Sequence, residues 1–238
     1  MTVGSIARHP AASAAAAVFG GLSTLRRRRS LHPDGLSYHA VVHLDGGVGP
    51  GGVPLLQGPA SHRALVRFSR GAGLPPSLPD VLGLALRFCD AHGEGRHQDL
   101  LMATSAKPPV LHHGLLPAVR GPFGQPYSTI LPYRAGDRVR LFGALPLRAP
   151  ARGEGTDLEA FAAAAARGEA RFALAMASPF RGWRRIGSIE VGAPLDAGTG
   201  ERLRFNPWNT GGGLRPIGPF QGLRDPAYSA SQRARLDT

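Results

Sequence analysis

The segment RDPAYSASQRARL (224–236) near the carboxyl end of the chain carries a tyrosine in a setting that suits metal chemistry. Asp225 followed by Pro226 is typical of a helix N-cap and first helical residue, which places Tyr228 in the first turn. There the positive end of the helix dipole favours the phenolate over the phenol. Because a free tyrosine has a pKa of about 10, a stable phenolate needs strong further help. A ferric ion with a nearby guanidinium would supply it, and tyrosinate is an established axial ligand of haem iron.

The same helix would place Tyr228, Gln232 and Arg235 on one stripe, at spacings of four and three residues. An ordinary amphipathic terminal helix is the alternative, and it needs no ligand. This segment alone leaves both interpretations open.

A histidine with acid–base potential occurs in the segment RSLHPDG (29–35). His32 is followed by Pro-Asp-Gly at the start of a predicted strand, where a turn could present the imidazole to a cavity. A loop histidine exposed to water is the alternative. The pair at 112–113 competes for any ligand role, and no spacing among the nine histidines resembles a closed metal site.

The segment ALVRFSRGAG contains an arginine among apolar strand residues. Strict alternation puts Arg67 on one face with Leu65 and Ser69. The intervening Val66 and Phe68 then take the other face. An arginine on a half-buried strand face needs an anionic partner, and an edge strand with the guanidinium in solvent is the alternative.

Several elements must position these residues. Alternation and turn residues predict strands at 35–47, 62–73, 81–90 and 98–104, two strands about a Gly-Asp turn within 127–148, and a further strand at 183–195. Thr156 with Glu159 predicts a capped helix that the alanine run extends to near Gly168. The segment 203–220 is expected to be an extended loop. Together these elements predict an α+β fold, an antiparallel β-barrel of about eight strands with a few flanking helices.

The composition fits such a barrel. The chain has 238 residues, 42% of them hydrophobic, and its 33 Gly and 22 Pro favour short strands and ordered loops over a helical bundle. Its formal net charge is +12 and Lys107 is its single lysine, so guanidinium groups are available to recognise carboxylate or phosphate. The single cysteine, Cys89, excludes an intrachain disulfide and a cysteine-based zinc or iron–sulfur site. A reducing cytoplasm is therefore the expected location.

The amino-terminal segment AASAAAAVFGGLSTL (11–25) superficially resembles a secretory signal. It is followed by RRRR (26–29), where a cleavage region should be small and uncharged. Fifteen mildly apolar residues are also fewer than the roughly 20 that span a bilayer. The sequence therefore predicts an Ala-rich helix and basic turn over 1–28, no transmembrane segment, and one domain over 29–238.

Three separated segments, in the right order, resemble the haem catalase family. RSLHPDGLSYHAVV resembles the family's distal segment, with an arginine three residues before the essential histidine and a glycine three residues after it. ALVRFSRGAGLPPSLPDVLGLALRFCD resembles the Val-Arg-Phe-Ser strand, its Ala-Gly, and the Asp-x-x-Gly before an apolar strand. RDPAYSASQRARL resembles the proximal Arg-x-x-x-Tyr with Gln-Arg-x-Arg-Leu after it. The resemblance touches most of residues 26–113 and 183–236.

The resemblance implies roles for particular residues, with haem b as the cofactor. Tyr228 would be the axial iron ligand and Arg224 its charge partner. His32 would be the distal acid–base residue, with Ser69 orienting it by a hydrogen bond. The haem propionates would be held by Arg29, Arg67 and Arg235.

The chain departs from the family's pattern at the distal asparagine, because no asparagine occurs before Asn206. Ala103 and Thr104 lie nearest the expected place, and Thr104 or Ser105 would be the substitute catalytic hydroxyl. The aromatic residue expected just beyond, stacked on the haem, is Leu111 or His112. Asp225 and Pro226 also replace two apolar residues.

The resulting hypothesis is a haem-dependent protein acting on a small-molecule peroxide. Peroxidase or organic hydroperoxide activity is favoured over fast hydrogen peroxide dismutation because the distal asparagine is missing. One alternative is a haem-free barrel with another small ligand, although Tyr228 and Arg235 would then have no purpose. The other is a nucleic-acid or anionic-membrane binder, which the net charge supports and the scarcity of aromatics among the basic residues opposes. No specific nucleic-acid partner is expected, and a homo-oligomer stays open.

Overall fold

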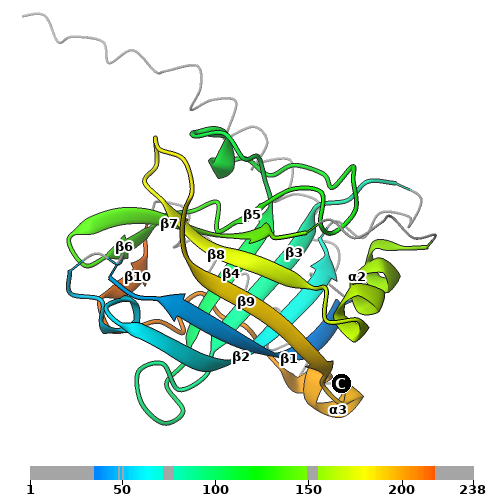
Figure 1. Ribbon diagram of the computed structural model, residues 1–238, viewed down its shortest axis with the longest axis horizontal. Helices are drawn as coiled ribbons and strands as arrows, with labels where there is room; N and C mark the ends of the chain where they lie inside the picture. Colours follow the sequence, from blue (N-terminus) through cyan, green and yellow to red (C-terminus); the bar gives the residue numbers. More distant parts are fainter. Residues whose placement is uncertain (1–34, 48, 50, 72–77, 149–154, 218–238) are drawn as a thin grey trace, which may run out of the picture.

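The computed structural model describes residues 35–47, 49, 51–71, 78–148 and 155–217, which fold around a closed antiparallel β-barrel (Figure 1). Its eight strands follow the order β7-β5-β4-β3-β2-β1-β9-β8, and pairing of β7 with β8 closes the ring. The barrel strands are β1 (Gly35–Asp45), β2 (Pro59–Arg70), β3 (Leu82–Phe88), β4 (Gln98–Thr104), β5 (Tyr127–Ser128), β7 (Arg138–Pro146), β8 (Arg171–Ala177) and β9 (Arg184–Pro194). The predicted barrel of about eight strands is confirmed.

Smaller elements are attached to this ring. The short strands β6 (Tyr133–Ala135) and β10 (Leu214–Pro216) extend the sheet beside β7. The described helices are α2 (Asp157–Ala166), α3 (Ala197–Arg202) and two 3-10 turns, Pro54–Leu56 and Leu111–His113. None of the helices in the described ranges combines the length and the apolar character that crossing a bilayer requires. The helix and basic turn predicted for 1–28 lie outside the described residues.

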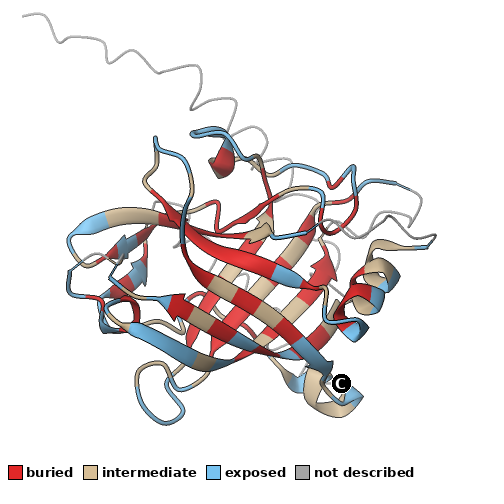
Figure 2. Cartoon of the chain, viewed as in Figure 1, coloured by how far each residue is buried: buried red, intermediate tan, exposed pale blue. Residues whose placement is uncertain are grey.

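Alternation along the strands fills the barrel with large side chains, as the buried stripes in Figure 2 show. On β2, Val66 and Phe68 are fully buried while Leu65 and Arg67 are only half-buried. The interior residues of neighbouring strands, among them Leu84, Leu86, Leu100 and Met102, are buried as well. An eight-stranded barrel is just wide enough for its own side chains to fill it. This barrel has a packed core.

Helix α2 covers one end of the barrel. Thr156 caps it: its hydroxyl accepts a hydrogen bond from the Glu159 amide at 3.3 Å, and the Glu159 carboxylate accepts one from the Thr156 amide at 2.7 Å. Phe161 is fully buried and stacks on Phe68 of β2 with a centroid distance of 4.2 Å. The predicted capping box and the helix end before Gly168 are confirmed.

A buried ionic cluster fixes this helix to the sheet. The Arg70 guanidinium lies 3.0 Å from the Asp157 carboxylate and 3.6 Å from that of Asp80, and it donates to the Leu78 carbonyl at 3.0 Å. Arg70 and Asp80 are almost wholly removed from water. A buried charge of this kind is tolerated only where partners surround it.

A second buried pair holds the segment that follows α3. The Arg87 guanidinium binds the Asp99 carboxylate through two hydrogen bonds of 2.7 Å. Asp99 also accepts hydrogen bonds from the Asn206 amide at 2.9 Å and the Asn209 side chain at 3.0 Å. Phe205 lies over the Arg87 guanidinium, 5.1 Å from the ring centroid. Residues 205–209 of the segment predicted as an extended loop are therefore anchored to β3 and β4, while residues 218–220 of that prediction lie outside the described residues.

Sequence reasoning found most of these strands and missed β8 and β10, the second of which lies within the segment predicted as an extended loop at 203–220. The predictions at 35–47, 62–73, 81–90, 98–104 and 183–195 correspond to β1, β2, β3, β4 and β9. The two strands predicted within 127–148 are three in the structure, because the chain bends near Ile130, whose φ is 61°. Strand β8 was not predicted.

Replacing Asp99 with alanine should cost roughly 3–5 kcal/mol of unfolding free energy, because it leaves the Arg87 guanidinium buried without its partner. Urea denaturation measures this loss. The matched control is Glu190→Ala, which breaks the exposed Arg171–Glu190 pair (3.4 Å) and should cost less than about 1 kcal/mol. Equal losses in the two variants would contradict the assignment of Asp99 as a structural anchor.

Candidate functional site

The outer face of β1–β4 carries a row of very small side chains. Cross-strand pairing places Gly35 beside Ser69, Ser69 beside Gly83, and Gly83 beside Ala103. Cross-strand partners share a face of the sheet, so these four residues, called here the small-residue row, form one continuous strip. No member of the row carries more than one heavy atom beyond Cβ. The sheet surface is therefore flat there, and a planar group can approach the backbone closely.

A second row lies beside the first and adds polar groups. Here Ser37 pairs with Arg67, Arg67 with Ala85, and Ala85 with Leu101. Arg67, Ala85 and Leu101 are half-buried, whereas the residues between them in sequence are buried in the barrel. The prediction that Arg67 shares a half-buried face with Leu65 and Ser69 is confirmed.

The Arg67 side chain turns toward the start of β1. A Cβ added at Gly35 would lie only 2.7 Å from Nη2 and 2.8 Å from Cζ of Arg67. The guanidinium therefore lies against the bare Cα of Gly35, and any larger residue at this position would displace it. Gly35 is three residues beyond His32 in the chain. Arg67 thus places a positive charge beside a strip without bulky side chains.

Ser37 adds an unsatisfied polar atom to this face. Its hydroxyl oxygen is buried and has no hydrogen-bond partner in the structure described here. Helix α3 packs close by, since a Cβ added at Gly200 would lie 3.7 Å from the Ser37 oxygen. A buried hydroxyl without a partner costs free energy, which a ligand oxygen could recover.

Thr104 lies on the other side of strand β4. It is fully buried, its hydroxyl donates to the Leu116 carbonyl at 2.6 Å, and it accepts from the Leu82 amide at 3.1 Å. Of the two residues nearest the missing asparagine, Ala103 is therefore the one on the Ser69 face. Ser105 is also fully buried, and its hydroxyl donates to the Leu111 carbonyl at 3.4 Å. Both hydroxyls are therefore engaged in hydrogen bonds to the main chain that stabilise the fold. A catalytic role for either residue stays a prediction.

Leu111 and His112, the two candidates for a stacking residue, differ in environment. Leu111 is exposed, whereas His112 is fully buried beside Trp183, with ring centroids 5.1 Å apart. His112 Nε2 donates to the Pro179 carbonyl at 3.1 Å. Burial, with a smaller contribution from His113, lowers the pKa of His112 below its usual value and keeps the ring neutral. His112 therefore packs the 105–126 segment against the connection between β8 and β9, which contains Pro179 and Trp183.

The remaining predicted site residues lie outside the described ranges. They are Arg29, His32, Arg224, Tyr228 and Arg235. Of the predicted site residues that the structure describes, Arg67 and Ser69 lie in adjacent rows of one face, and Thr104 does not join them. Within the described ranges, no group of three or more His, Cys, Asp or Glu side chains could hold a metal ion.

Sequence reasoning missed the small-residue row and the orphaned Ser37 hydroxyl. The signal was partly present, because Gly83 and Ala85 alternate with leucines in VLGLALRF. Small residues at every second position indicate one flat face of a strand. Their alignment with Ser69 and Ala103 depends on the register of three strands, which a single sequence does not give.

No protein-family profile and no curated protein sequence matches the chain. Solved structures do match it. A bacterial catalase superposes with a TM-score of 0.63 at 16% identity, over 92% of this chain and 60% of that one. A fungal catalase has a TM-score of 0.59 at 14% identity, over 90% of this chain and 60% of that one. Catalase A from Saccharomyces cerevisiae has a TM-score of 0.55 at 13% identity, over 90% of this chain and 62% of that one.

The chain thus spans about 60% of the length of these catalases. At identities this low, the likeness concerns the fold. The described residues therefore form a catalase-like β-barrel whose sequence differs greatly from those of the matched catalases.

Proposed function

We propose that the chain binds haem b against the outer face of β1–β4 and uses it to react with a peroxide. The observation that carries the proposal is the small-residue row, a flat strip beside the half-buried guanidinium of Arg67. A planar macrocycle with carboxylate substituents needs these two features together. The barrel interior is filled by its own side chains, so the outer face is the side on which such a ligand fits.

Arg67 is the residue that would bind a propionate. Its planar guanidinium can donate two parallel hydrogen bonds to a carboxylate, which a lysine cannot do. Arg29 and Arg235 are proposed to complete the propionate contacts. The unpartnered Ser37 hydroxyl neighbours Arg67 across β1 and β2, and it can donate to a carboxylate oxygen in the same place.

Tyr228 is proposed as the residue that would hold the haem iron, and Arg224 would be the charge that keeps its phenolate deprotonated. When bound, haem supplies the redox-active iron that peroxide chemistry requires. Support for this assignment comes from the order of the three segments that resemble catalases and from the catalase-like barrel.

His32 is proposed as the acid–base residue on the open side of the ring. Its imidazole would take a proton from one peroxide oxygen and return it to the leaving oxygen, which assists O–O cleavage. Ser69 is the neighbour proposed to orient it. Gly35 follows His32 by three residues in the sequence and pairs directly with Ser69, which supports this proposal.

The missing amide favours slow or alternative peroxide chemistry. Ala103 occupies the β4 position on the Ser69 face and offers only a methyl group. A donor that holds a peroxide oxygen in place is therefore lacking at this position, and such donors typically contribute about 10²–10³ in rate. We therefore infer a peroxidase or an organic hydroperoxide reaction in preference to fast dismutation of hydrogen peroxide.

The first test is an absorption spectrum of the purified full chain from haem-supplemented cells, beside Tyr228→Phe. The wild type should show a Soret band that the variant loses or shifts, because phenylalanine cannot ligate iron. Tyr38→Phe is the matched control, since it removes a hydroxyl from a buried tyrosine on the interior face of β1 and should leave the spectrum unchanged. A colourless wild type that takes up no added hemin would refute the proposal and leave a haem-free barrel.

Ala103→Asn should raise the rate of hydrogen peroxide decomposition by at least about tenfold, because it adds an amide donor on the Ser69 face. Oxygen evolution at fixed haem content measures the rate. Ala103→Leu, which has a similar size and no amide, should give no gain. An unchanged rate in the asparagine variant would contradict the inferred place of Ala103 beside the reacting peroxide.

A further inference from the structure

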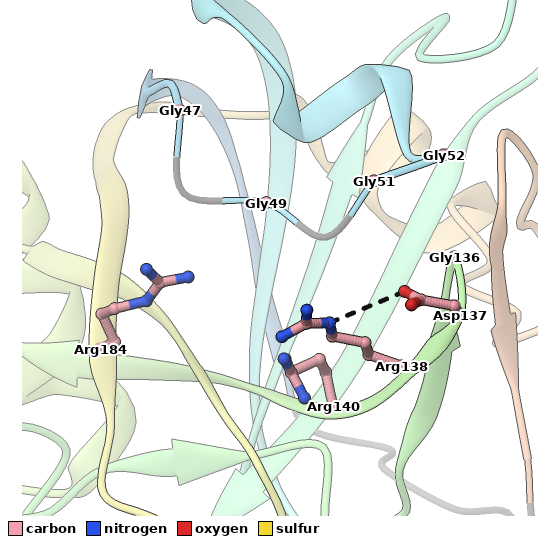
Figure 3. Close-up of a pocket in the computed structure, with 9 residues that line it drawn as sticks. All are labelled: Gly47, Gly49, Gly51, Gly52, Gly136, Asp137, Arg138, Arg140 and Arg184. Carbon is pink, nitrogen blue, oxygen red and sulfur yellow. Dashed lines mark ion pairs between the residues drawn. The ribbon is translucent and has the colours of Figure 1, made fainter.

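A second site lies at the far end of β1 from the small-residue row. A cavity of about 750 Å³ opens between Gly47, Gly49, Gly51 and Gly52 on one side and the β6–β7 hairpin on the other (Figure 3). Strand β1 separates this cavity from Gly35 by its length of 11 residues, or about 30 Å. The cavity is therefore independent of the proposed haem face.

Three arginines point their guanidinium groups into this cavity. Arg138 and Arg140 share a face of β7, and Arg184 reaches in from the start of β9 on the opposite side (Figure 3). Among the described residues that line the cavity, Asp137 is the one carboxylate. Its ion pair with Arg138 is 3.8 Å long and both partners are largely exposed, so it neutralises little of the positive charge.

Burial and the arrangement of these charges shift the pKa of Arg140. Burial, followed by the charges of Arg138 and Arg184, lowers the pKa of its guanidinium, and Asp137 offsets only part of this effect. One of its nitrogens donates to the Val139 carbonyl at 2.8 Å. Like charges gathered in a partly desolvated pocket are stabilised by an anion placed among them.

The glycines make the opposite wall from backbone alone. Gly136 has a φ of 59°, and a Cβ at this position would collide with the Gly51 carbonyl oxygen. A Cβ at Gly213 would likewise collide with the Gly52 carbonyl oxygen. The hairpin and the residue pair 51–52 are thus packed main chain against main chain. On the cavity side, a Cβ added at Gly47 or Gly51 would meet no described atom within 4 Å, so a ligand can approach the backbone there.

We propose that this cavity binds a small molecule that carries two or more phosphate groups. Guanidinium groups on two sides of the cavity can bind phosphate oxygens in a bidentate manner, so a ligand with more than one phosphate can use both sides. The volume lies within the range of small-molecule sites. None of the described residues that line the cavity is aromatic, so recognition depends on the phosphates rather than on stacking with a ring.

The test is isothermal titration of the full chain with inorganic pyrophosphate at fixed ionic strength. The wild type should bind it saturably with one site, and Arg138→Gln with Arg140→Gln should weaken binding at least about tenfold. The matched control is Arg134→Gln with Arg215→Gln, which removes the same charge from two exposed, paired positions of β6 and β10. This control should bind pyrophosphate as the wild type does. The single variant Arg138→Gln, at a largely exposed position, tests the site even if the double variant folds poorly.

Three results would overturn the proposal. The first is no saturable binding of millimolar pyrophosphate by the wild type. The second is an equal loss of affinity in the pocket variants and the control, which would indicate general charge attraction. The third is a single-stranded oligonucleotide that binds much more tightly than pyrophosphate and is insensitive to the pocket variants, which would assign the basic surface to a nucleic acid.

Discussion

The closure of eight strands into a filled barrel is the constraint on which the rest of the structure depends. Closure gives every strand an inner and an outer face, and large residues such as Phe68, Phe88 and Phe172 fill the inner one. A cofactor-sized ligand must therefore bind outside the ring or at its ends. Helix α2 covers one end by inserting Phe161 among these aromatic rings. The outer face of β1–β4, with its small residues, is then the available flat surface.

Charge is distributed over this scaffold in two distinct ways. Arg70 and Arg87 are almost fully buried, and each is surrounded by carboxylates and carbonyl oxygens that fix a neighbouring element. Arg67 and the cluster at Arg138 and Arg140 lie at half-open surfaces, and their placement suits external anions. The net charge of +12 therefore contains structural cations as well as candidate binding groups. Composition alone cannot separate the two kinds, because the difference depends on how deeply each guanidinium is buried in the folded chain.

The sequence predicted elements well where alternation or a cap was clear. Strand β4 has the predicted bounds, and Thr156 begins α2 as expected. Strand β8 was missed because both of its faces are buried, so RFALAMA shows no alternation and continues an alanine-rich run. The face shared by Arg67 and Ser69 followed from alternation within one strand. The exclusion of Thr104 from that face and the selection of Ala103 required the register between β3 and β4, a long-range property that one sequence does not reveal.

The central claim is that a planar haem lies on the small-residue row, and a hemin titration of Gly83→Leu tests it most directly. Gly83 lies between Ser69 and Ala103, so a leucine there would project a branched side chain from the middle of the strip. Gly192→Leu, at an exposed position of β9, is the control. The account predicts at least about tenfold weaker hemin binding for Gly83→Leu and wild-type binding for the control. Hemin binding by Gly83→Leu that matches the wild type would contradict it.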